Sequence, residues 1–137
     1  MGVILDTSVL IAGERGGESV QGIVRRVQTK CGEQHAAFSV VTLVELTHGI
    51  YRAKRDSDRT RRLAFTEELR QVMVVYPVTV EIAQLAGRIE GEQAARGVSI
   101  AFEDLLIGAT ALWLSYQVAT ANLRHFQMIP GLSAVQI

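Results

Sequence analysis

The segment Val3-Ile4-Leu5 restricts the fold more than any other feature, because it is apolar throughout and ends directly on a carboxylate, Asp6. A strand that is apolar on both faces is typical of the centre of a parallel sheet covered by helices. Further strands are predicted at residues 36–39, 74–76, 118–120 and 134–136, with helical segments between them except at residues 122–131, where a loop is predicted. This alternation predicts a three-layer α/β/α sandwich around a central parallel sheet of four or five strands.

The length of 137 residues predicts a single domain, residues 1–137, with its own hydrophobic core. Lysine plus arginine and aspartate plus glutamate both number 14, so a nucleic acid would have to be held by a local patch or a metal. A single cysteine, Cys31, is typical of a reducing compartment. No apolar run is long enough to span a bilayer. We therefore expect a cytoplasmic protein without a membrane partner.

Three acidic residues, Asp6, Glu45 and Asp104, lie in apolar surroundings, where ionised carboxylates are rare without a partner. Asp6 ends the first strand, and Glu45 lies about two turns into the helix after the strand at 36–39. The helix that begins near Asp104 spans roughly 21 Å and ends just before the strand at 118–120. All three carboxylates are therefore predicted at the carboxyl edge of the sheet, where ligands bind in such folds.

The predicted cluster has an electrostatic consequence. Two carboxylates about 5 Å apart repel by roughly 3 kcal/mol at an effective dielectric near 20. Such a cluster either takes up a proton or binds a divalent cation, and oxygen ligands favour Mg²⁺ or Mn²⁺. Bound Mg²⁺ is typical of phosphoryl chemistry. Thr120 and Asn122, just after the strand at 118–120, are expected at the same edge.

Four motifs together resemble those of the PIN-domain ribonucleases, in particular the VapC-type toxins of bacterial type II toxin–antitoxin modules. They come in the order of that family and with nearly its spacing. The motifs are Leu5-Asp6-Thr7-Ser8-Val9-Leu10-Ile11, Val41-Thr42-Leu43-Val44-Glu45-Leu46-Thr47-His48-Gly49-Ile50, Ile100-Ala101-Phe102-Glu103-Asp104-Leu105-Leu106-Ile107-Gly108-Ala109-Thr110-Ala111-Leu112 and Ala119-Thr120-Ala121-Asn122-Leu123-Arg124-His125-Phe126.

The resemblance implies a Mg²⁺-dependent endoribonuclease, with Mn²⁺ as a substitute, that hydrolyses RNA through a metal-activated water. It also implies a homodimer that a cognate antitoxin holds inactive. Asp6 and Asp104 match the metal ligands of the family, and Glu45 matches its third acid. The family often has a fourth acid at the position of Asn122 or His125, and this chain has none there. We assign Asn122 to the site and expect one metal ion in the free protein.

Each acid also has a plainer interpretation. Asp6 fits a helix N-cap, and Glu45 alone fits an exposed helix position. Asp104 fits the positive end of a helix dipole, as does Glu103, which we interpret as structural. The six cations between residues 52 and 62 form the only basic cluster and fit a solvated connection slightly better than an RNA contact.

Two other classes of function compete with the nuclease. A haloacid-dehalogenase-like phosphatase also has an Asp after its first strand, but it needs an acid two residues later, where this chain has Ser8. The stronger alternative is a catalytically silent PIN-like domain that binds RNA or protein, and the missing fourth acid motivates it. A metal titration separates this alternative from the nuclease.

Overall fold

The computed structural model describes residues 1–137 and contains seven helices and five strands. The strands are β1 (Gly2–Leu5), β2 (His35–Ser39), β3 (Val74–Tyr76), β4 (Gln117–Thr120) and β5 (Ala134–Gln136). The helices are α1 (Thr7–Arg15), α2 (Val20–Cys31), α3 (Val40–Arg52), α4 (Asp56–Val72), α5 (Val80–Ala94), α6 (Phe102–Leu114) and α7 (Leu123–Gln127).

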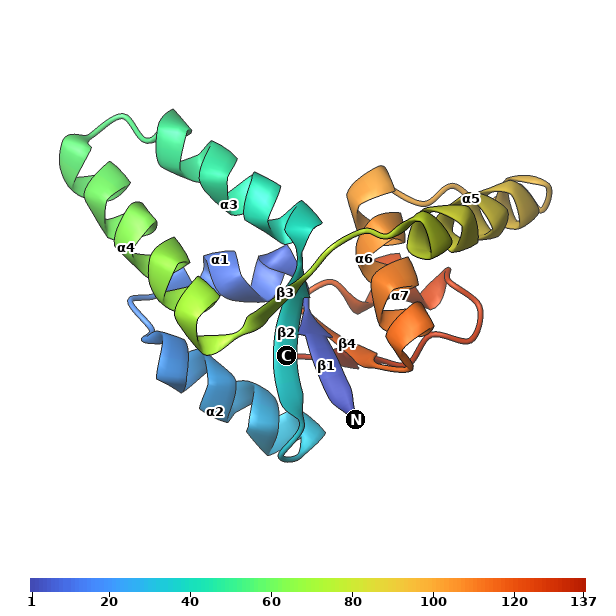
Figure 1. The fold of residues 1–137 in the computed structure, drawn as a ribbon, viewed down its shortest axis with the longest axis horizontal. Coiled ribbons are helices and arrows are strands. Elements are labelled where there is room, and N and C mark those ends of the chain that lie inside the picture. The colour runs from blue at the N-terminus through green and yellow to red at the C-terminus, as the bar shows by residue number, and fades with distance from the viewer.

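The five strands form one parallel sheet in the order β3-β2-β1-β4-β5. Ile4 of β1 pairs with Ala37 of β2 on one side and with Val118 of β4 on the other. The apolar first strand is therefore the central strand, as the sequence predicts. Because all strands run the same way, the ends of β1, β2 and β4 meet at one edge of the sheet (Figure 1).

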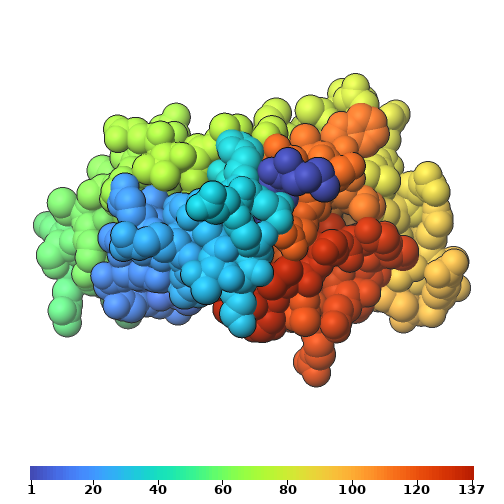
Figure 2. All heavy atoms as spheres, turned by 90° about the horizontal axis from the view of Figure 1, so that it is seen from below, coloured from blue at the N-terminus to red at the C-terminus, as the bar shows by residue number.

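Helices cover both faces of the sheet, which confirms the three-layer sandwich (Figure 1). On one face, Val9, Ile23 and Leu69 of α1, α2 and α4 pack against the odd-numbered residues of β1. On the other face, α5, α6 and α7 pack around Ile4, and this cluster contains Ile82, Ile107 and Phe126. Figure 2 looks onto the amino edge, where the first residues lie beside the segment that enters β2.

Helix α3 lies across the carboxyl edge and contacts both apolar clusters. The Ser39 hydroxyl caps its first turn by accepting a hydrogen bond of 3.1 Å from the Val41 amide. Leu46 is buried in the cluster of α1, α2 and α4, whereas Val41 packs against the cluster of α5 and α6. This position holds the side chains of α3 directly above the ends of the strands.

The structure corrects two predicted connections. Residues 122–131, predicted as a loop, contain α7, whose Phe126 is fully buried. The polar stretch from Arg52 to Arg62 is mostly helical, because α4 begins at Asp56 and only three residues join it to α3. No helix is long and apolar enough to cross a membrane.

Candidate active site

Asp6 follows β1 and is 5% exposed. It occupies the N-cap position of α1, yet its side chain makes no capping hydrogen bond. Its Oδ2 instead accepts hydrogen bonds from the hydroxyls of Ser8, at 2.7 Å, and Thr120, at 2.8 Å. The plain N-cap interpretation is therefore wrong for the side chain. These bonds orient the carboxylate and leave Oδ1 without a protein partner.

Glu45 projects from α3 toward the same edge, and its Oε1 accepts a hydrogen bond of 2.7 Å from the hydroxyl of Thr7. The Thr7 hydroxyl also lies 2.9 Å from that of Thr42, one turn earlier in α3. Burial raises the pKa of Glu45, and the charges of Asp6 and Asp104 raise it further against the opposing effect of the Thr7 hydrogen bond. The carboxylates of the three predicted acids are thus close enough to interact.

Asp104 lies in the first turn of α6, with 17% of its side chain exposed. Burial raises its pKa, as does the charge of Asp6, whereas His125 lowers it. His125 lowers this pKa because its Nδ1 lies 3.1 Å from Asp104 Oδ2. Helix α7, which the sequence did not predict, positions this histidine.

Asn122 lies beside the cluster but does not contact its carboxylates. It precedes α7 and is exposed, and its side chain makes no hydrogen bond. Its backbone amide donates a hydrogen bond of 2.9 Å to the Thr120 hydroxyl, which in turn bonds to Asp6. The structure therefore connects Asn122 to Asp6 through the backbone and one hydroxyl.

Two residues near the cluster have roles that the sequence did not suggest. Glu103 was predicted to be structural, yet it is exposed next to Asp104, and its charge raises the pKa of both Asp104 and Glu45. His125 was not assigned to the site from the sequence, yet it contacts Asp104 directly. Its place three residues after Asn122, where the family often has an acid, was the only sequence signal for it.

The cluster fits a hydrated Mg²⁺ better than a closed metal site. No three His, Cys, Asp or Glu side chains are close enough to hold an ion among themselves. However, Asp6 Oδ1, Glu45 Oε2 and Asp104 Oδ1 all lack a hydrogen-bond partner and reach solvent. Mg²⁺ is typically held by one or two carboxylates and retains several waters. The donor set therefore suits that ion.

Comparison with known proteins identifies the family of this chain. The PIN domain profile matches residues 3–131, nearly the whole chain. The chain belongs to the PIN domain family. The sequence of this PIN domain is 32% identical to ribonuclease VapC1 of Rickettsia felis over 139 residues, which cover all of this chain and 97% of that protein. It is thus a VapC-type member of the family.

Solved structures match this PIN domain over its full length. The DNA-bound VapBC complex of Salmonella typhimurium matches with a TM-score of 0.84 and 25% identity, over 99% of this chain and 98% of the matched chain. VapBC2 of Rickettsia felis, bound to a DNA fragment from its promoter, matches with a TM-score of 0.86 over 100% and 99% of the two chains. At 18% identity, this second likeness shows the fold alone.

Proposed function

We propose that this PIN domain is a Mg²⁺-dependent endoribonuclease and the toxin of a toxin–antitoxin module. One observation carries the proposal. Carboxylates from β1, α3 and α6 converge on one edge, and each keeps a solvent-accessible oxygen free of protein hydrogen bonds. The names of the relatives, ribonucleases VapC among them, support RNA as the substrate.

In this proposal, Asp6 and Asp104 would hold the ion, with Glu45 beside it. Bound Mg²⁺ would supply charge stabilisation at the phosphate and would orient the attacking water. Ser8 and Thr120 fix the rotamer of Asp6 by donating to Oδ2. Glu45 has a raised pKa, caused first by burial, so its carboxylate accepts a proton from the attacking water more readily than an ordinary glutamate.

A catalytically silent PIN-like domain would have no need for solvent-exposed carboxylate oxygens. A binding module gains nothing from three acids that repel one another, and burial together with Asp6 disfavours the charged form of Asp104. An arrangement that costs stability without metal is expected where metal chemistry requires it. We therefore favour the nuclease.

The proposal includes two protein partners, an antitoxin and a second copy of this chain. The matched VapBC structures are toxin–antitoxin complexes, which supports a cognate antitoxin for this chain. Exposed apolar side chains, among them Val44 at 68%, Val80 at 71% and Phe102 at 63%, support a homodimer. Sedimentation at micromolar concentration should give about twice the monomer mass, and a clean monomer would remove the dimer without affecting the nuclease.

Cleavage of total RNA tests the activity. Purified protein should generate new RNA ends with Mg²⁺ and none with EDTA, and sequencing those ends identifies the target. Asp6→Ala and Asp104→Asn should each lower the rate about 100-fold or more, because the ion contributes several kcal/mol to transition-state stabilisation. Both variants should remain folded. Wild-type rates in either variant would refute the assigned site.

A further inference from the structure

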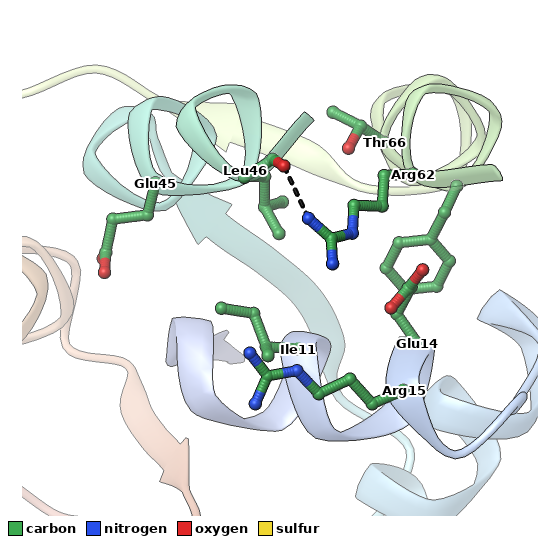
Figure 3. A pocket seen from close by; sticks show the side chains of 9 residues that line it. Ile11, Glu14, Arg15, Glu45, Leu46, Arg62 and Thr66 are labelled. Atoms are coloured by element: carbon green, nitrogen blue, oxygen red, sulfur yellow. Dashed lines mark hydrogen bonds between the residues drawn. The ribbon is translucent and has the colours of Figure 1, made fainter. Parts of the chain in front are cut away.

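A groove lies between α1, α3 and α4, and Glu45 lies at its inner end. Figure 3 shows Glu45 on α3 and Arg62 on α4, with the side chain of Arg15 lying along α1. The groove continues outward past His48 to the connection between α3 and α4, where Arg52, Lys54 and Arg55 line it. We call this surface the basic groove.

The cations near this connection divide into two groups. Arg59 donates to the carbonyls of Ile50 and Ala53, and Arg62 donates to that of Gly49 at 2.7 Å. These arginines satisfy carbonyls at the end of α3 and fix the α3–α4 connection. Arg61 is also engaged, since it pairs with both Glu14 and Asp58.

The second group has no partner within the protein. Arg15, Arg52, Lys54 and Arg55 are all exposed, and none of them forms an ion pair or a side-chain hydrogen bond. The groove therefore presents four positive charges without ion-pair partners. They lie next to the α3–α4 connection that Arg59 and Arg62 fix. In a chain with a formal net charge of zero, this is a local excess.

We propose that the basic groove binds the phosphates of single-stranded RNA on one side of the cleavage point. The proposal rests on the proposed function, because it takes the scissile phosphate to lie at Asp6, Glu45 and Asp104. A strand held there has to leave the cluster in both directions. The basic groove begins at Glu45, so one of these directions passes the four free cations.

Charge and shape favour a nucleic-acid strand over an acidic protein segment. Arg15 lies on α1, whereas Arg52, Lys54 and Arg55 line the outer part of the groove, and the seven residue steps of α3 from Glu45 to Arg52 rise by about 10 Å. A strand with regularly repeated phosphates matches this distribution of cations. The opposite side of the cluster, near Asn122 and Gln136, has a second hollow with a single arginine, Arg124.

Binding without metal isolates the groove from catalysis. A fluorescent 12-nucleotide single-stranded RNA is titrated with protein in EDTA, and anisotropy is measured at several salt concentrations. The variant Arg52→Gln/Lys54→Gln/Arg55→Gln should bind about tenfold or more weakly at low salt, and its salt slope should fall by about 2, since each phosphate contact contributes about 0.7. Arg25→Gln/Lys30→Gln/Arg96→Gln is the matched control, because its three exposed cations on α2 and near α5 also lack partners.

The possible outcomes distinguish failure of the RNA-binding groove from failure of the proposed nuclease activity. Loss of affinity in the groove variant with an unchanged control supports the groove, whether or not the unmodified protein cleaves RNA with Mg²⁺. Equal losses in both variants, or no loss in the groove variant, overturn it. If the groove variant instead loses affinity only for a polyglutamate peptide, the groove is a protein-docking surface and the RNA assignment is wrong.

Discussion

The hydroxyl of Thr120, at the end of β4, donates a hydrogen bond of 2.8 Å to Oδ2 of Asp6, at the end of β1. The two strands are neighbours, and the Asp6 amide also donates to the carbonyl of Ala119 at 2.9 Å. Asp6 is therefore fixed by backbone and side chain together. Because Oδ2 already accepts two hydrogen bonds, Oδ1 is the oxygen available to the proposed Mg²⁺.

Replacing Thr120 by valine tests whether this bond orients the carboxylate. Thr120→Val keeps the shape but removes the donor, and loss of such a supporting bond lowers metal affinity by about 10- to 100-fold. Calorimetric titration of Mn²⁺ measures the change. Thr120→Ser retains the hydroxyl and should bind nearly as the unmodified protein does. Equal affinity in all three proteins would contradict the role of Thr120.

Without metal, Glu45 should make stability depend on pH. Burial, the largest cause, raises its pKa above 4.5, so the folded state binds this proton more tightly than the unfolded chain. The contribution of Glu45 to the free energy of unfolding therefore falls as the pH rises from about 4.5 through the folded pKa. Glu45→Gln should accordingly be more stable than the unmodified protein at pH 7, with the difference vanishing near pH 4. Urea unfolding in EDTA at both pH values checks this, and a difference that grows toward low pH would show the opposite sign.

His125 should shift the pH dependence of metal binding. Burial and the charge of Asp6 raise the pKa of Asp104, and His125 counteracts them. In His125→Ala the pKa of Asp104 should rise further, so Mn²⁺ affinity should fall more at pH 6 than at pH 8. His125→Gln, which retains a donor, should show a smaller shift. A uniform loss at both pH values would indicate a purely structural effect.

Asn122 provides a test of metal stoichiometry. With three carboxylates, we expect one Mn²⁺ per chain in the free protein. Asn122→Asp adds an anionic oxygen next to Thr120, so it should strengthen Mn²⁺ binding. Calorimetry gives both the number of sites and the affinity. Two tight sites in the unmodified protein, or unchanged affinity in the variant, would show that Asn122 does not face the metal.

The strands were predictable because each is a short apolar segment with clear boundaries, and β1 is apolar on both faces. Helix α7 was missed because its five residues are too few to show helical periodicity, and its formation depends on burial of Phe126. The start of α4 was missed for a different reason. Its first turns are polar, and Arg59 and Arg62 bond to the end of α3 in a way that no local pattern reveals.

The convergence of Asp6, Glu45 and Asp104 was predictable from topology alone, because parallel strands bring their ends to one edge. The oxygen that stays free is set by the Ser8 and Thr120 hydroxyls at Asp6, by the Thr7 hydroxyl at Glu45 and by His125 at Asp104. Sequence spacing does not encode these contacts. The contact between His125 and Asp104 depends on α7 and was inaccessible for the same reason that α7 was.

Asp6 and Thr120 are separated by 114 positions, so the ribosome adds them to the chain at well-separated times. Asp6 emerges from the ribosome before Asp104 and Thr120, and it lacks these neighbours until β4 has emerged and paired with β1. A nascent chain therefore carries no assembled carboxylate cluster while most of its message is being read. A product terminated before β4 would lack the assembled cluster for the same reason.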